Sequence, residues 1–181
     1  MATRTDTREV LRYAACSTSY FKEKTSDPLH SGTAAMHIEQ ENWTHRHLDA
    51  VSRVLVVDDY RASAIAVADY LSLFGIQTRV AGGCGDALEI IRSWIPDVVL
   101  LDLMMPQRDG FTTARAIRQY PPTSGAFICA YTAREEALIT RSDEGSLFDG
   151  YVRKGASPPS LLSWLNQLGT GPESTGRRAC T

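Results

Sequence analysis

From residue 52 onward, short apolar runs alternate with longer segments in which apolar residues recur at helical spacing. Several of the apolar runs contain no polar position, as expected for strands that are buried on both faces of a sheet. We predict strands at 54–57, 76–81, 98–101, 126–131 and 151–153. We predict helices at 61–75, 86–94, 111–119, 135–141 and 157–168. The last helix is expected to begin with Ser157 as its N-cap and Pro158 at its first position.

This alternation predicts the fold class. Strand and helix alternate five times within residues 52–168, so each strand is separated from the next by a helix. Such a pattern requires parallel strands joined by right-handed crossovers. The expected fold is therefore α/β, a doubly wound five-stranded parallel sheet with helices on both faces. Residues 169–181, which are mostly small and polar, are expected to form a flexible tail.

The first 51 residues differ in composition from the rest. Only six of the first fifty are Leu, Ile, Val or Phe, too few for a hydrophobic core, so 1–51 is expected to be an N-terminal extension, disordered or partly helical. Solvated side chains are favoured over a metal site for His37, His45 and His47, because no rigid frame surrounds them. Met36 leaves open a later start of translation, and the role of residues 1–35 stays open with it.

Composition and charge exclude several classes of protein. The chain has 19 Lys+Arg and 21 Asp+Glu, a net charge of −2, which argues against binding of nucleic acid by the whole chain. The longest unbroken apolar run, 126–131, is six residues long, so no membrane span is predicted. The four cysteines are far apart with no CxxC pair, which favours a reduced, cytoplasmic protein over a disulfide scaffold or a zinc module.

Polar side chains follow four of the predicted strands, namely Asp58 and Asp59, Asp102, Thr132 and Lys154. Because the carboxyl ends of parallel strands meet at one edge of a sheet, these side chains should converge. Three neighbouring carboxylates repel one another unless a cation neutralises them, and open all-oxygen ligation suits Mg²⁺. An ammonium and a hydroxyl beside that cation would suit a tetrahedral phosphate, and one carboxylate can act as a nucleophile that forms an acyl phosphate.

Lys154 is further distinguished by composition. The chain has 16 arginines but only three lysines, and the other two, Lys22 and Lys24, lie in the N-terminal extension. A lysine at a strand end in such an arginine-rich chain indicates that a compact point charge is required there. The alternative is that lysine occurs at this position by chance. For Asp58 and Asp59 taken alone, the alternative is capping of the helix that follows.

The chain also resembles the receiver domain of two-component response regulators, in four stretches that occur in the same order. These are VLVVDD (54–59), VVLLDLMMP (98–106) followed by Asp109 and Gly110, AYTA (130–133) and GYVRK (150–154). The resemblance covers 52–168, and it is to the chemotaxis-regulator type, a receiver that stands alone. It implies the flavodoxin-like strand order 2-1-3-4-5.

The resemblance implies a phosphoryl-transfer site. Asp102 would accept a phosphoryl group from a histidine kinase or from a histidine phosphotransfer protein. Asp58 and Asp59 would hold Mg²⁺, with Asp102 itself and the main-chain carbonyl of Met104 completing the protein ligands.

The resemblance also implies a switch. Lys154 would pair with one phosphoryl oxygen, and Thr132 would move to bond another. Tyr151 would be the aromatic residue that follows this threonine, with the output face within 134–168. If Thr132 and Lys154 bind the phosphoryl group better in one of two arrangements of the domain, phosphorylation would increase the population of that arrangement.

Two stretches depart from the family pattern. Proline usually follows the lysine of strand five through a cis bond, whereas Gly155 stands here. A non-proline cis bond costs about 2.5–4 kcal/mol, so the isomer of the Lys154–Gly155 peptide stays open, and the loop that aims Lys154 is expected to differ. Residues 147–150, LFDG, replace the family's Gly-Ala-Asp-Gly, and the added apolar bulk would either pack inward or form a partner surface.

The function indicated is a phosphoacceptor receiver of a two-component or phosphorelay system, which is not an enzyme beyond its own phosphotransfer and dephosphorylation. The alternative is a pseudo-receiver that switches without phosphorylation, which Gly155 favours. A phosphatase or phosphomutase is disfavoured, because 58–60 (DDY) lacks the second aspartate of a DxD motif. Only about thirteen residues follow the last predicted helix, so no DNA-binding domain is expected and the downstream target would be an unidentified protein.

Overall fold

The computed structural model describes residues 48, 50–106 and 110–169. The expectations for most of the N-terminal extension, for the three histidines, for Asp109 and for nearly all of the C-terminal tail concern residues outside these ranges. The described residues belong to one unit of the chain, Met36–Thr181. No helix among them is long and apolar enough to cross a membrane, and the predicted cytoplasmic location stays a prediction.

Five parallel strands form a single sheet, which confirms the predicted fold class and strand order. The order is β2-β1-β3-β4-β5, and every neighbouring pair is parallel. The strands are β1 (Arg53–Val57), β2 (Gln77–Ala81), β3 (Val98–Leu101), β4 (Phe127–Thr132) and β5 (Gly150–Arg153). Each begins and ends within one residue of its prediction.

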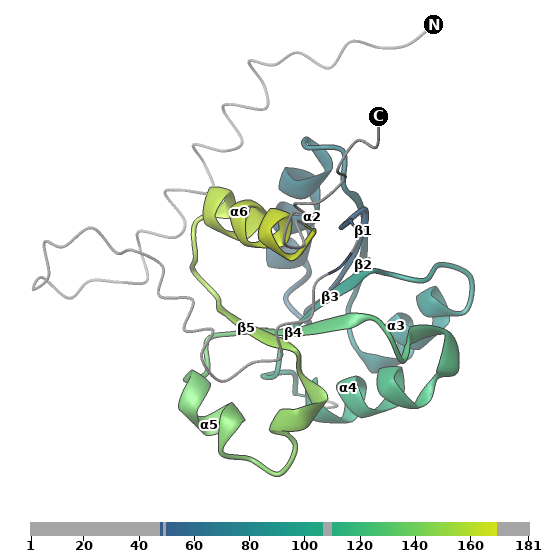
Figure 1. Cartoon of the computed structure of the whole chain (residues 1–181), viewed down its shortest axis with the longest axis vertical. Coiled ribbons are helices and arrows are strands. Elements are labelled where there is room, and N and C mark those ends of the chain that lie inside the picture. The colour runs from purple at the N-terminus through teal and green to yellow at the C-terminus, as the bar shows by residue number, and fades with distance from the viewer. Residues whose placement is uncertain (1–47, 49, 107–109, 170–181) are drawn as a thin grey trace, which may run out of the picture. The chain divides into compact units, whose positions relative to one another are not determined.

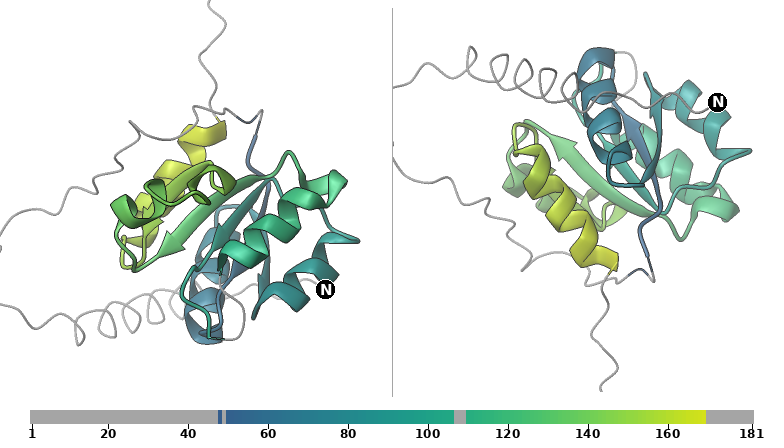
Figure 2. Two further views of the ribbon diagram at one scale, coloured as in Figure 1. Left: turned by 90° about the horizontal axis from the view of Figure 1, so that it is seen from below. Right: turned by 90° about the horizontal axis from the view of Figure 1, so that it is seen from above.

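Helices cover both faces of this sheet (Figures 1 and 2). They are α2 (Arg61–Ser72), α3 (Cys84–Ile91), α4 (Gly110–Gln119), α5 (Glu136–Thr140) and α6 (Pro158–Gly169), with short 3-10 turns η1 (Pro121–Thr123) and η2 (Gly145–Leu147). Helices α2 and α6 lie on one face, and α3 and α4 on the other. Ser157 caps α6 as predicted, because its Oγ accepts a hydrogen bond from Ser160 N at 3.3 Å.

Strand alternation divides the core into two halves. In β1, Leu55 and Val57 pack with residues of α3 and α4, whereas Val54 and Val56 pack with residues of α2 and α6. These four side chains are at most 1% exposed, which explains why residues 54–57 include no polar position. A parallel strand covered on both faces loses the polar–apolar alternation of a surface strand.

The helix boundaries differ from their predictions where glycine or turn geometry intervenes. Helix α2 ends at Ser72 instead of residue 75, and the chain leaves it through a turn that ends at Gly75, with φ +82°. Helix α3 begins two residues earlier than predicted, directly after Gly83. Helix α5 has five residues against seven predicted, and a turn closed by Gly145 N donating to Ser142 O follows it.

The apolar bulk of residues 147–150 packs inward, which answers the question left open by the sequence. Phe148 is 3% exposed and meets Phe111 edge to face, with ring centroids 5.5 Å apart. Beside it, the carboxylate of buried Asp149 accepts a hydrogen bond from Ile128 N at 2.8 Å and forms an ion pair with Arg118. This segment therefore ties β5 to α4 and β4.

Candidate functional site

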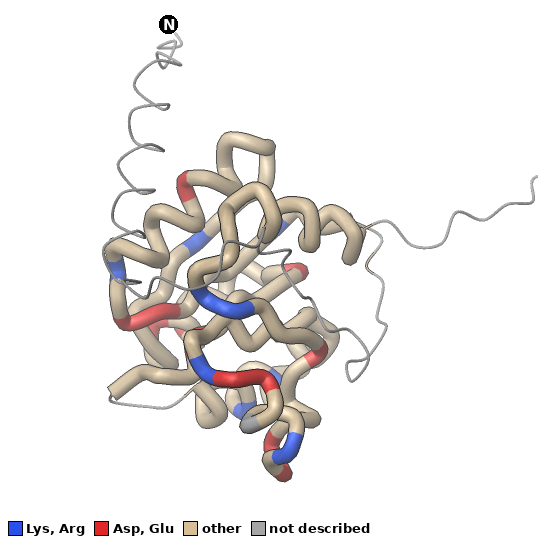
Figure 3. The backbone as a smooth tube through the Cα atoms, turned by 90° about the vertical axis from the view of Figure 1, so that its left-hand side faces the viewer, with Lys and Arg blue, Asp and Glu red and all other residues tan. Residues whose placement is uncertain are grey.

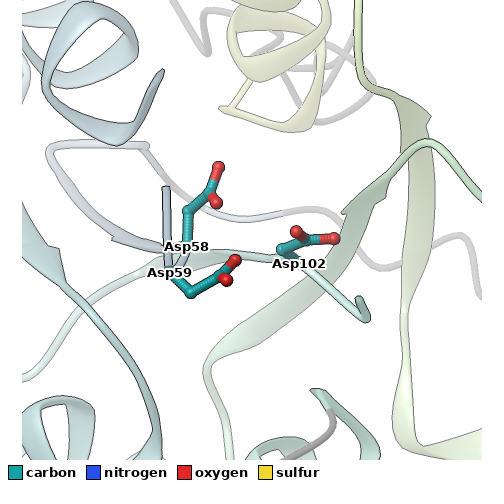
Figure 4. Close-up of side chains that lie close together, drawn as sticks. All are labelled: Asp58, Asp59 and Asp102. Carbon is teal, nitrogen blue, oxygen red and sulfur yellow. The ribbon is translucent and has the colours of Figure 1, made fainter. Parts of the chain in front are cut away.

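Three carboxylates converge at the carboxyl edge of the sheet, as predicted. Asp58 and Asp59 follow β1, and Asp102 follows the neighbouring strand β3 (Figure 4). One oxygen of each carboxylate lies within 4.8 Å of one oxygen of the other two. Asp58 and Asp102 are 1% and 4% exposed, whereas Asp59 is exposed. The cluster is thus buried on one side and open to solvent at Asp59.

Backbone hydrogen bonds and one local side-chain bond hold these residues in place. Asp102 N donates to Val57 O at 2.9 Å, which extends the β1–β3 pairing up to the cluster. Asp58 Oδ1 accepts a hydrogen bond from Tyr60 N at 2.9 Å, which turns the chain toward α2. Tyr60 itself is the N-cap of α2 and no side-chain bond caps the helix, so the capping alternative for the two aspartates is wrong.

Gly110, the first residue of α4, allows the chain after Asp102 to approach the helix closely. A Cβ at this position would lie 2.4 Å from Asp102 O and 2.8 Å from Leu103 Cα. Both are backbone atoms, so no side chain could move aside, and only glycine fits without a shift of the main chain. The sequence indicated Gly110 only as part of a motif, and the contact explains why that position needs glycine.

Lys154 reaches the carboxylate cluster from the end of β5. Its Nζ lies 2.6 Å from Asp102 Oδ2 and 2.8 Å from Asp58 Oδ2. Partial burial lowers the pKa of Lys154, but hydrogen bonds and charge attraction from Asp102 and Asp58 outweigh that effect, so its pKa is raised overall. The ammonium group therefore stays charged at neutral pH and stands beside the predicted acceptor oxygen.

The remaining predicted residues lie at the same edge but do not join the carboxylates. Thr132 is fully buried, and its Oγ1 accepts a hydrogen bond from Arg134 N at 3.4 Å. The hydroxyl of Tyr151 donates to Arg134 O at 2.7 Å. Met104 exposes 61% of its surface and donates its main-chain N–H to Asp102 Oδ1 at 3.1 Å. The switch roles of Thr132 and Tyr151 and the ligand role of the Met104 carbonyl stay predictions.

The loop after Lys154 differs from the family pattern as expected. No described peptide bond is cis, so the Lys154–Gly155 peptide is trans. Gly155 has φ +98°, a conformation that residues with a Cβ rarely adopt. A trans peptide with left-handed glycine thus stands where the family has cis proline.

The donor set fits a divalent cation. Three ionised carboxylates and one ammonium leave a net charge of −2, which one divalent ion balances. Asp58 Oδ2 is buried, and its partner among the described residues is the Lys154 ammonium, 2.8 Å away. A buried carboxylate oxygen is costly unless a charge compensates it. Oxygen ligands of this kind, with one side open to water, suit Mg²⁺.

Tyr131 is a residue of this region that the sequence reasoning missed. It is 4% exposed on β4, and burial raises its pKa to about 12, helped by the negative charges of Asp58 and Asp102. The signal was present in the sequence, because Tyr131 immediately precedes Thr132 and places a phenol at the end of the apolar run 126–131. Strand registration is needed to show that its neighbour on β3 is Asp102.

The raised pKa of Tyr131 predicts how the fold responds to high pH. The folded chain holds the phenol proton more tightly than the unfolded chain, so the stabilisation is complete below the ordinary tyrosine pKa of about 10 and is lost as the pH rises toward 12. Phenolate absorbance of the folded, metal-free protein at about pH 11 checks this. The wild-type chain and Tyr131→Phe should show equal phenolate per molecule. One extra phenolate in the wild type would contradict it.

Comparison with known proteins gives a consistent match. The family model described as "Response regulator receiver domain" matches residues 54–166. DNA-binding response regulator MtrA of Mycolicibacterium smegmatis is 35% identical over 111 residues, 61% of this chain and 47% of MtrA. Transcriptional regulatory protein YxdJ of Bacillus subtilis is 30% identical over 113 residues, 62% of this chain and 48% of YxdJ. The chain spans about half the length of the curated relatives it matches.

Solved structures agree with these matches. Chemotaxis response regulator CheY4 of Vibrio cholerae superposes with a TM-score of 0.59 at 25% identity, covering 66% of this chain and 99% of CheY4. Response regulator TrrA of Thermotoga maritima, solved in complex with Mg²⁺-BeF, gives a TM-score of 0.55 at 30% identity, covering 65% of this chain and 98% of TrrA.

The comparisons contradict one prediction. We predicted no DNA-binding domain, on the ground that only a short segment follows the last helix. Relatives such as MtrA are named as DNA-binding response regulators, and the match occupies about half of their length. The prediction is therefore wrong, because the length of sequence after a receiver region says nothing about the output to which the receiver is coupled.

Proposed function

Because the chain belongs to the family of response regulator receiver domains, the signalling modules of two-component systems, we propose that it accepts a phosphoryl group on Asp102. The observation that supports this most directly is the environment of the Asp102 carboxylate. Its Oδ2 lies 2.6 Å from the Lys154 ammonium, and its Oδ1 accepts a hydrogen bond from Met104 N. Two donors thus hold a nearly buried carboxylate at the open end of the sheet, where an incoming phosphate can meet it.

The donor is proposed to be a phosphohistidine of a partner protein. A carboxylate oxygen of Asp102 would form a bond to phosphorus as the phosphorus–nitrogen bond of the phosphohistidine breaks, and the imidazole nitrogen would keep the electron pair and take up a proton. Lys154, already paired with Asp102, would follow the negative charge onto a phosphoryl oxygen. The proton comes from water, and the step needs no other reactant.

Mg²⁺ is the proposed cofactor. The carboxylates of Asp58, Asp59 and Asp102 and the main-chain carbonyl of Met104 would hold it. When bound, Mg²⁺ supplies positive charge that offsets the repulsion between the carboxylates and the phosphate dianion. The residues of the chain do the positioning, since the backbone bonds of β1 and β3 fix Asp58 and Asp102 before any ligand arrives.

The proposed switch couples Thr132 to Tyr151 through one residue. The hydroxyls of both contact main-chain atoms of Arg134, one as acceptor and one as donor. Phosphorylation adds about −1.5 to −2 charge units at the edge of the sheet. A Thr132 hydroxyl that turns to a phosphoryl oxygen would give up its bond from Arg134 N and alter the contact of Tyr151. The face formed by 134–168 would carry the change outward.

The output proposed for this switch is control of DNA binding. The MtrA relatives, which are named DNA-binding response regulators, favour it over contact with an unspecified protein. Figure 3 shows both acidic and basic positions along the backbone on the side that faces the viewer. The net charge of −2 gives no basic excess of the kind that binds the DNA backbone. The receiver would thus act on DNA binding indirectly, through a protein contact.

One experiment tests the proposal. The protein is incubated with Mg²⁺ and acetyl phosphate, a small acyl phosphate, and its intact mass is recorded. We expect one phosphoryl group per chain, removed by hydroxylamine and by base as an acyl phosphate should be. If no adduct forms with Mg²⁺ present, the phosphorylation-independent pseudo-receiver is the better description. Release of free phosphate from ester substrates, with no adduct, would instead indicate a hydrolase.

A further inference from the structure

A row of side chains crosses four strands at the level of the carboxylate cluster. The register pairs Val57 with Leu101 and Leu101 with Ala130, so the residues that come next, directly after β1, directly after β3 and on β4, are also neighbours. Those residues are Asp58, Asp102 and Tyr131. Tyr131 is in turn paired with Val152 of β5. The row therefore reads Asp58, Asp102, Tyr131, Val152.

All four members of this row belong to the α2 and α6 face of the sheet. Tyr131 and Val152 pack in the core half that contains α2 and α6, together with Val56 and Leu100. Asp58 and Asp102 come two residues after Val56 and Leu100, and strand side chains alternate with a period of two. Lys154 comes two residues after Val152 and continues the same face.

Lys154 must cross β4 to reach its partners. In the sheet order, β4 stands between β5, which carries Lys154, and β3, which carries Asp102. Neighbouring strands are about 4.8 Å apart, so β5 and β3 are roughly 10 Å apart, and the side chains of Lys154 and Asp102 together span that distance. Within the row, Tyr131 is the residue that separates Val152 from Asp102. The lysine stem therefore passes Tyr131 on its way to the carboxylates.

The N–H of Lys154 donates to Thr132 O at 2.9 Å, but the residue after Lys154 restrains the main chain little. Gly155 follows Lys154 at φ +98°, and no atom lies within 4 Å of the place where a Cβ would stand. A proline ring at that position would fix the main chain after the lysine, whereas glycine leaves it the widest conformational freedom of any residue. The residues around the Lys154 side chain must therefore supply the conformational restraint that Gly155 does not.

We infer that Tyr131 is a positioning residue for Lys154: its ring is the surface along which the lysine stem crosses β4, and it keeps water from one side of the ion pair with Asp102. The inference rests on the proposed phosphotransfer for its functional consequence, but not for its structural content. Tyr131 is 4% exposed, so its ring excludes solvent from this part of the site. Its raised pKa agrees with a low-polarity setting next to negative charge. Ion pairs are stronger in such surroundings than in water.

The first test observes Lys154 directly. The chain has three lysines, so ¹³C-lysine labelling gives few signals, and only Lys154 lies within the described domain. A held side chain shows two distinct shifts for its ε-CH₂ protons, and a freely rotating one shows a single averaged shift. In metal-free buffer we expect two shifts for the wild type and for Tyr131→Phe, which keeps the ring. Tyr131→Leu should show one averaged shift.

A matched control separates positioning from core packing. Phe127 lies on β4 with Tyr131, faces the same core half and is 2% exposed, with its ring 5.8 Å from that of Trp164. Phe127→Leu removes an aromatic ring from the same strand and face, four residues farther from the site. It should leave the Lys154 signals unchanged. Two distinct shifts in folded Tyr131→Leu, or an averaged shift in Phe127→Leu as well, would overturn the inference.

The second test measures function. Tyr131→Leu should slow phosphorylation by acetyl phosphate at saturating Mg²⁺ about tenfold, since misplacing a catalytic group by about an ångström has effects of this size or larger. In a Lys154→Met background the same change should alter the rate less than about twofold, because the group it positions is gone. Equal slowing in both backgrounds would overturn the inference. A wild type that is not phosphorylated would overturn the proposed function instead, and the NMR test would still judge Tyr131.

Discussion

Asp102→Asn is expected to abolish the phosphoryl adduct formed with acetyl phosphate and Mg²⁺ while the protein stays folded. The asparagine amide is not nucleophilic enough to form an acyl phosphate, whereas its shape preserves the packing at the end of β3. Its Oδ1 can still accept the hydrogen bond from Met104 N, and Lys154 keeps Asp58 as an ion-pair partner. Intact mass measures the adduct, and far-UV circular dichroism measures the fold.

The control for this variant is an aspartate outside the site. Asp69 is exposed on α2, so Asp69→Asn removes one carboxylate without touching the cluster and should leave the adduct at the wild-type level. If Asp102→Asn still acquires a hydroxylamine-labile phosphoryl group, then Asp102 is not the acceptor. Peptide mapping would in that case identify the residue that is, with Asp58 and Asp59 the first to inspect.

Asp149→Ala is expected to destabilise the fold by about 3–5 kcal/mol, because it leaves a mostly buried arginine without its carboxylate. The Arg118 side chain is 18% exposed and that of Asp149 10%. The Asp149 carboxylate also accepts the hydrogen bond of Ile128 N on β4. Removing the carboxylate therefore leaves a second buried donor without this acceptor. With total stabilities of about 5–15 kcal/mol, the variant should be close to unfolding. Urea denaturation gives the free energy of unfolding.

The chain offers an exposed ion pair as a comparison. Arg115 of α4 pairs with Glu144, and their side chains are 48% and 39% exposed. Glu144→Gln should change the free energy of unfolding by less than about 1 kcal/mol, because water screens such pairs. Equal effects of the two substitutions would show that burial of the Arg118–Asp149 pair does not determine its contribution.

Periodicity carried most of the fold prediction. The four buried residues of β3 and the uninterrupted apolar run of β4 are unambiguous because these strands are covered on both sides. The predicted helix ends were less accurate, because local sequence does little to determine them. Helix α5 is shorter than its polar pattern indicated. Helix α2 ends at a turn in which Gly75 adopts a positive φ that other residues rarely adopt. Short polar helices depend on tertiary contacts for their ends, which no local pattern contains.

The site shows the same division. Asp58, Asp59, Asp102 and Lys154 were predictable because each follows a strand, and parallel strands bring their ends to one edge. The isomer of the Lys154–Gly155 peptide was not predictable from the sequence. A cis bond before glycine would need stabilising contacts from the rest of the fold, and local sequence does not show whether these exist. The output was mispredicted because it depends on what the receiver is coupled to, and only comparison with relatives bears on that.

The alternation of strands and helices along the chain was enough to establish the fold class, and the polar residues at the strand ends were enough to identify the members of the carboxylate cluster. The sheet order came from the resemblance to the family. The tertiary structure decided which groups face one another across strands: Lys154 over β4 to Asp102, Tyr131 between them, and Asp149 inward onto Arg118. The physical reason is that periodicity reports which face of a strand a residue occupies. The neighbour of that residue across the sheet depends on the register of the strands. The register is set by hydrogen bonds between segments that are distant in sequence, and these bonds exist only when the sheet has formed.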